Sequence, residues 1–165
     1  MRAHLALILT LLPALPLAAE PEPDLDSRVR AITDAITDDA LADAPSRTAL
    51  LRPPGADYAS LPDHSVAGVA ARNARLDGWL AELAGIDRAT LADPTMRLAY
   101  DFARSRLEDG QRLRVCRPEL WRVSQMGNAW LVEFADAALA QPIETPELRK
   151  AALARAAALP HYVDD

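Results

Sequence analysis

The sequence has few of the residues on which most enzyme and metal chemistry depends. Its 165 residues include one cysteine, three histidines and six glycines. A single cysteine excludes a disulfide within the chain. Cys116 has no histidine near it in sequence, so we expect a small buried apolar residue rather than a nucleophile. No Gly-x-Gly-x-x-Gly fingerprint, phosphate-binding loop or Gly-x-Ser-x-Gly elbow occurs in the sequence.

The histidines do not form a metal-binding pattern. His4 lies in the first residues of the chain, whereas His64 and His161 are 97 residues apart, and no H-E-x-x-H motif is present. A catalytic zinc needs three protein ligands. The sequence therefore predicts no catalytic, cofactor-binding or metal-binding residue in this chain.

Lysine is almost absent, and acidic residues outnumber basic residues. Of 18 basic residues only Lys150 is a lysine, and 24 acidic residues give a net charge of -6. This balance argues against a nucleic-acid binder or an anionic-membrane binder. Seven arginines lie within residues 97–122, against four acids. They fit either a patch for an anionic ligand or, as we favour, a solvated helix face with paired charges.

The first 19 residues have the pattern of a secretory signal. Arg2 precedes the apolar run 5–12, and Ala18 and Ala19 provide small residues at a cleavage site. The run is shorter than the roughly 20 apolar residues of a membrane span. We expect cleavage after Ala19, an exposed acidic lead-in over residues 20–24, no membrane span afterwards, and a periplasmic or secreted protein.

Helical periodicity dominates the rest of the chain. The predicted first helix covers 25–42, with an apolar stripe through Leu25, Val29, Ile32 and Ile36 and with Asp34, Asp38 and Asp39 facing water. Residues 43–64 are rich in proline and predict a long loop, held to the surface by Leu50, Leu51, Tyr58 and Leu61.

Helix-start signals place the remaining elements. Ser65 caps a helix to residue 84, after which Gly85 fits the left-handed position and Ile86 folds back on the last turn. Asp93-Pro94 starts a helix to 115. Further helices are predicted over 129–139 and 145–159, and Pro160 suits the start of another.

No segment alternates as a strand does, so the predicted fold is all-α, with about five helices and long irregular loops. The element expected at Pro160 has only five residues after it. We therefore expect residues 25–165 to be the incomplete N-terminal portion of a larger helical fold.

One stretch is not explained by a plain helical bundle. Residues 121–130 combine large apolar side chains with polar groups on a segment without helical period. The segment is either a loop plugged into the core or part of a ligand-facing wall. In the second case the candidate residues are Trp121, Gln125, Asn128 and Trp130.

Several segments in a fixed order resemble one protein family. They are residues 61–68 (LPDHSVAG), 86–87, 96–104 (MRLAYDFAR), 116–126 (CRPELWRVSQM), 141–142 and 157–164 (AALPHYVD). Together they resemble the N-terminal part of the bacterial secreted domain-of-unknown-function family 885, over residues 25–165. The resemblance implies a largely helical protein of zinc-metallopeptidase type, whose H-E-x-x-H-type motif lies beyond this region. No position here matches those ligands, so zinc is expected only in a full-length parent.

Two functions follow as hypotheses. The chain is either the N-terminal part of an exported metallopeptidase-like protein, inert on its own, or a stand-alone periplasmic helical module that binds a partner. The expected partner is accordingly the remaining C-terminal part of the parent or an unknown protein. Whether an enzyme activity is involved is left open by the sequence.

Overall fold

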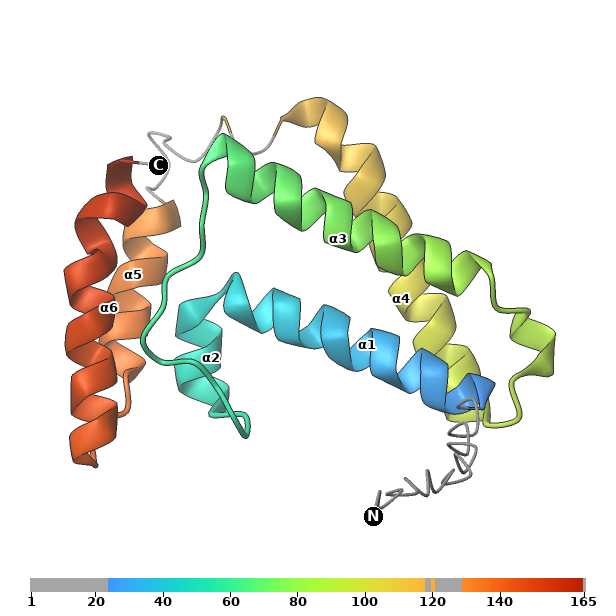
Figure 1. The fold of residues 1–165 in the computed structure, drawn as a ribbon, viewed down its shortest axis with the longest axis horizontal. Helices are drawn as coiled ribbons and strands as arrows, with labels where there is room; N and C mark the ends of the chain where they lie inside the picture. The colour runs from blue at the N-terminus through green and yellow to red at the C-terminus, as the bar shows by residue number, and fades with distance from the viewer. Residues whose placement is uncertain (1–23, 118–119, 121–128, 165) are drawn as a thin grey trace, which may run out of the picture.

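The computed structural model describes residues 24–117, 120 and 129–164, with the backbone alone for 129, 130 and 164. All regular elements among these residues are helical, which confirms the all-α prediction. In chain order they are α1 (Leu25–Ala42), α2 (Pro45–Leu51), α3 (Val66–Ala84), the 3-10 turn η1 (Arg88–Thr90), α4 (Pro94–Leu113), the 3-10 turn η2 (Arg114–Cys116), α5 (Ala129–Ala140) and α6 (Pro146–Asp164) (Figure 1).

Local capping explains where the long helices begin. The Asp24 carboxylate accepts a hydrogen bond from the Ser27 N–H, the Ser65 hydroxyl accepts one from the Gly68 N–H, and the Asp93 carboxylate accepts one from the Thr95 N–H. Pro94 takes the first helical position of α4, where a missing N–H costs no hydrogen bond. The starts predicted at residues 65 and 93 are confirmed.

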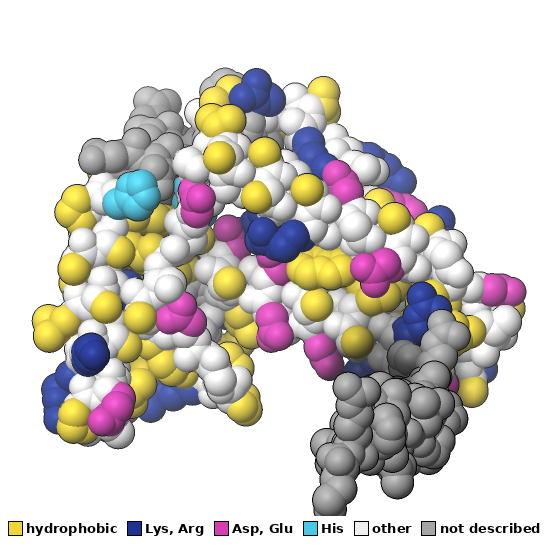
Figure 2. Space-filling view, in the orientation of Figure 1, with side chains coloured by type: hydrophobic (Ala, Val, Ile, Leu, Met, Phe, Trp, Pro, Cys, Tyr) yellow, Lys and Arg dark blue, Asp and Glu magenta, His cyan; other side chains and the backbone are white. Residues whose placement is uncertain are grey.

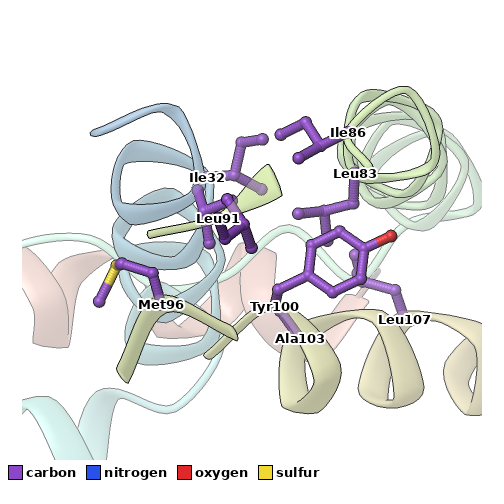
Figure 3. Close-up of a cluster of buried hydrophobic side chains, with 9 residues drawn as sticks. Ile32, Leu83, Ile86, Leu91, Met96, Tyr100, Ala103 and Leu107 are labelled. Atoms are coloured by element: carbon purple, nitrogen blue, oxygen red, sulfur yellow. The ribbon is translucent and has the colours of Figure 1, made fainter. Parts of the chain in front are cut away.

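The main core lies between α1, α3 and α4. Nine buried side chains form it, and Figure 3 shows eight of them labelled, with Leu83, Tyr100 and Leu107 converging from α3 and α4. The predicted α1 stripe faces this core, with Val29 and Ile32 buried. The nine residues are Val29, Ile32, Leu83, Ile86, Leu91, Met96, Tyr100, Ala103 and Leu107.

A second group of helices lies at the other end of the molecule. Helix α2 packs against α5, and α6 lies at the same end (Figure 1). The Glu133 carboxylate accepts hydrogen bonds from the Ser46 N–H at 2.7 Å and from the Ser46 hydroxyl at 2.8 Å. This carboxylate therefore holds α5 against the first turn of α2, where the backbone N–H groups have no helical partner.

The prediction of an unbroken loop over 43–64 was wrong. Residues 45–51 form α2, because Pro45 takes the first helical position and the seven-residue helix packs on α5. Leu50 and Leu51 do not hold the segment to the surface, since they are 74% and 62% exposed. Tyr58 and Leu61 are half-buried, as expected.

The prediction of a new helix at Pro160 was also wrong. Helix α6 runs through Pro160, although an interior proline typically costs about 3 kcal/mol. Arg155 and Tyr162 are seven residues apart on the buried side of α6, so packing on both sides of Pro160 supports a continuous helix.

The end of α3 differs in part from the prediction. Gly85 adopts a right-handed φ of -79° rather than the expected left-handed one, while Ile86 is buried as predicted.

Candidate functional site

Two of the segments that carry the family resemblance meet in space. His64, just before α3, lies against Tyr162 of α6, with ring centroids 5.2 Å apart and planes tilted by 46°. The His64 Nε2 atom is 3.4 Å from Oδ1 of Asp43, at the end of α1. We call this meeting point of α1, α3 and α6 the His64–Tyr162 junction. No pattern in the sequence indicates this contact, because Tyr162 lies far from His64 in the chain.

The segment before α3 is shaped by short-range hydrogen bonds. The Asp63 carboxylate accepts the Ser65 N–H at 2.9 Å, and Ser65 caps α3 through Gly68. Hydrogen bonds from Ser65 hold the pKa of the Asp63 carboxyl below its usual range, and the charges of His161 and His64 add to the effect. Gly68 has no side chain, which lets Asp63 lie directly against the helix.

A cluster of charged side chains joins α1 to α3 beside the junction. Arg72 donates from Nε to Asp39 at 2.7 Å and from Nη1 to Asp43 at 2.5 Å, and Arg75 donates to Asp39 at 2.8 Å. The Asp39 side chain is only 7% exposed. The prediction that Asp39 faces water was therefore wrong, because two arginines one turn apart on α3 cover it.

Arg155 of α6 fixes the segment between α2 and α3. Its guanidinium donates to the backbone oxygens of Ser60 at 3.1 Å and Asp57 at 3.0 Å, and to Oε1 of Gln141 at 2.7 Å. Gln141 in turn donates to the backbone oxygen of Tyr58. Arg155 is 3% exposed, and burial lowers the pKa of its guanidinium. No pattern in the sequence indicates this role, since Arg155 falls within an alanine-rich helix.

These elements line a partly open cavity of about 300 Å³. Its walls come from the end of α1, from α2, from the 52–65 segment, from α3 and from Arg155. Figure 1 shows the 52–65 segment running past α6 to reach the start of α3. Four aspartates and three arginines line the cavity, so it carries charges of both signs. A volume of 300 Å³ is at the lower end of the range for small-molecule sites.

Most of the chain matches one known protein family. Residues 46–165, from α2 to the last residue, match the family described as bacterial protein of unknown function (DUF885). The chain belongs to the DUF885 family. The comparisons with curated proteins and with solved structures found no match. In this DUF885 protein His64 and Tyr162 lie within the matched region, as does most of the cavity lining. The lining residues that precede the match are Asp39, Leu41, Ala42, Asp43 and Pro45.

The DUF885 chain also exposes large apolar side chains on α5. Only Glu133 and Asp136 are polar among its 12 residues. Leu131 is 47%, Val132 55% and Leu139 86% exposed, and we call these three residues the α5 face. A shallow groove of about 450 Å³ between α2 and α5 adjoins it, lined in part by Leu50 and Leu139. Figure 2 shows further hydrophobic side chains over the α6 end of the molecule.

The arginines of α4 and η2 are mostly paired, as the sequence favoured. Arg104 and Arg112 both bind Glu108, and Arg114 binds Asp77 at 2.7 Å, which lowers the pKa of that aspartate. Asp101 of α4 is bound from outside its own helix. Arg88 binds Asp101 through two hydrogen bonds of 2.6 Å, while Arg97 donates to the backbone oxygens of Leu91 and Ala92.

The remaining sequence predictions have mixed outcomes. Cys116 is exposed rather than buried, because it follows α4 in η2 and has left the α4 core face. Of the candidate ligand-facing residues, Trp121, Gln125 and Asn128 lie outside the described residues, and Trp130 belongs to the first turn of α5. Ala19 also lies outside them.

The described residues contain neither a group of metal ligands nor a helix that could cross a membrane. No three His, Cys, Asp or Glu side chains in this part of the chain are grouped so that they could hold a metal ion. No helix in the described ranges is both long enough and apolar enough to cross a membrane.

Proposed function

We propose that this chain is a non-catalytic helical part of an exported protein of metallopeptidase type. Its contribution is to dock through the α5 face onto another polypeptide body. That body is the remaining part of the same protein, and the zinc chemistry implied by the family resemblance belongs to it. The chain's own sequence supports this division of roles, because it contains no H-E-x-x-H motif and only three histidines.

The exposure of α5 is the observation that carries the proposal. An apolar helix surface is normally covered by other apolar groups. In this chain Leu139 is 86% and Val132 is 55% exposed, while Ala137 on the opposite side is buried. Burying one leucine side chain stabilises a protein by roughly 1.5–3 kcal/mol. Covering the α5 face therefore offers a large favourable free energy to a body of matching shape.

In the isolated chain, the uncovered α5 face should be detectable by its binding of a hydrophobic dye. We expect a helical circular dichroism spectrum together with strong binding of a hydrophobic dye, low unfolding cooperativity and a tendency to aggregate. The double variant Leu131→Glu/Leu139→Glu should lower dye fluorescence by about half without loss of helicity, because it removes two exposed leucines. The matched variant Ala70→Glu/Ala74→Glu on α3 adds the same charge at exposed positions and should leave the fluorescence unchanged. Equal effects of both variants would exclude the α5 face as the dye site.

Export is the second part of the proposal, and it has its own test. The short positive end at Arg2, the apolar run over 5–12 and the small residues before Glu20 support removal of a signal peptide after Ala19. Mass spectrometry of the cell-envelope fraction should find Glu20 as the N-terminal residue. Recovery of the chain with intact Met1 from the cytoplasm would contradict export.

A stand-alone periplasmic binding module is the second candidate function. The observation that favours it is the core of α1, α3 and α4, whose nine buried residues all lie between positions 29 and 107. Such a closed core is compatible with independent folding. The genomic sequence downstream of codon 165 distinguishes the two candidates. If it encodes an H-E-x-x-H motif, it supports a larger peptidase-type protein. A stop codon followed by intergenic sequence, with a sharply melting monomer that ignores the dye, supports the module.

A further inference from the structure

Arg155 carries a buried positive charge that has no carboxylate partner within the described part of the chain. It is 3% exposed, and its three hydrogen bonds all go to uncharged oxygens, those of Ser60, Asp57 and Gln141. No ion pair of Arg155 is found among the described residues, whereas Arg72 and Arg75, in the same cavity wall, both bind Asp39 directly. Buried charges in proteins are normally paired. The charges of Asp57 and Glu133 favour the charged guanidinium. Neither carboxylate forms an ion pair with it in the described part of the chain, so a ligand carboxylate can supply the direct partner.

The guanidinium is placed to receive such a ligand. Arg155 lines the 300 Å³ cavity. A guanidinium has five N–H donors, and the hydrogen bonds to the protein use three of them. Two donors are left on a planar group that matches the two oxygens of a carboxylate. The bound oxygens of the 57–60 segment and of Gln141 hold the guanidinium in one orientation.

The same cavity also contains sites for a positive charge. Asp57 and Asp63 line it, and their backbone hydrogen bonds come from Ala59, Ser60 and Ser65 and all reach Oδ1. Hydrogen bonds hold the pKa of both carboxyls below the usual range, so both are charged at neutral pH. Aspartates outnumber arginines in the lining by one. This charge balance disfavours a multiply charged anion such as phosphate and favours a ligand with both charges.

We propose that this cavity is a binding site for a small zwitterion, an amino acid or a dipeptide, with its carboxylate on Arg155 and its ammonium group facing Asp57 and Asp63. This inference is independent of the docking function of α5. Asp57 and Arg155 are 98 positions apart in the sequence, and folding brings the two residues to the same cavity.

Calorimetric titration of the full chain with L-alanyl-L-alanine tests the proposal. We expect saturable binding that weakens at least about tenfold for the N-acetylated dipeptide and for its C-terminal amide, each of which lacks one charge. Inorganic phosphate should not bind. In a parallel titration followed by NMR, the side-chain Nε–H resonance of Arg155 should shift in proportion to occupancy.

A pair of alanine variants on α3 locates the site without removing Arg155. Ala71 lines the cavity and Ala74 does not, and both are exposed. Ala71→Leu should fill part of the cavity and weaken binding at least about tenfold, whereas Ala74→Leu should change it less than about twofold. The proposal is overturned by absence of saturable binding, by equal binding of the amide, by tighter binding of phosphate, or by equal affinities of the two variants. If Ala71→Leu fails to fold, an unshifted Arg155 resonance in the natural chain would overturn it.

Discussion

Replacing Arg155 with alanine is expected to lower the free energy of unfolding by about 2–4 kcal/mol. The guanidinium is the hydrogen-bond donor to the backbone oxygens of Asp57 and Ser60 and to the Gln141 side chain. Its removal leaves these part-buried acceptors without a donor, and each unsatisfied buried acceptor costs roughly 1–3 kcal/mol. Desolvation of the charge offsets part of the loss, which is why the expected total is below the sum of three such costs.

Urea denaturation followed by circular dichroism measures this effect. Arg155→Lys should recover only a small part of the stability, because an ammonium group does not reproduce the planar fork that reaches three oxygens. Lys150→Ala on the same helix is the control, since Lys150 is exposed, and it should change stability by less than about 0.5 kcal/mol. A stability of Arg155→Ala equal to that of Lys150→Ala would show that the 57–60 segment does not depend on Arg155.

Two glycine substitutions in α3 are expected to have opposite effects. A side chain at Gly68 would meet the Asp63 carboxyl and lie 2.5 Å from the Asp63 backbone oxygen, closer than real contacts allow. Gly68→Ala should therefore lower the free energy of unfolding by about 1–2 kcal/mol, because overpacking exceeds the helical preference of alanine. Gly78 has no atom within 4 Å of the added carbon, so Gly78→Ala should raise stability by about 0.5–1 kcal/mol.

Thermal unfolding of the two variants in one buffer checks the predicted difference in sign. The comparison is well matched, because both glycines lie in the same helix and the same methyl group is added. A stabilised Gly68→Ala would mean that the 61–68 segment does not lie against α3 as described. It would also weaken the account of the cavity, since Asp63 and Gly68 both line it.

The long helices could be predicted because their signals are local. Ser65 and Asp93-Pro94 mark the starts of α3 and α4 through bonds within three residues, and the α1 stripe repeats within one element. Helix α2 was missed because its seven residues are too short to show a period. Its stability comes from α5, through a contact between Ser46 and Glu133 that spans 87 positions.

The candidate site was not visible in the sequence for the same reason. Arg155 binds residues 95 and 98 positions earlier in the chain, and His64 meets Tyr162 across 98 positions. Asp39 was predicted to face water because the two arginines that cover it belong to another helix. The sequence patterns do indicate segments that take part in the site, since residues 61–68 and 157–164 both reach the His64–Tyr162 junction. They do not indicate which side chains of these segments contact each other.

The most direct test of docking is chemical labelling of the α5 face in its natural setting. In a Cys116→Ser background, Leu139→Cys should react readily with a small maleimide in the purified chain, where Leu139 is 86% exposed. In intact cells of the native bacterium, the same position should be protected at least about tenfold, because the covering body excludes the reagent. Lys150→Cys serves as the control and should react equally in both settings. Equal reaction of Leu139→Cys in cells and in the purified chain would show that the α5 face is uncovered in its natural setting and would contradict the account.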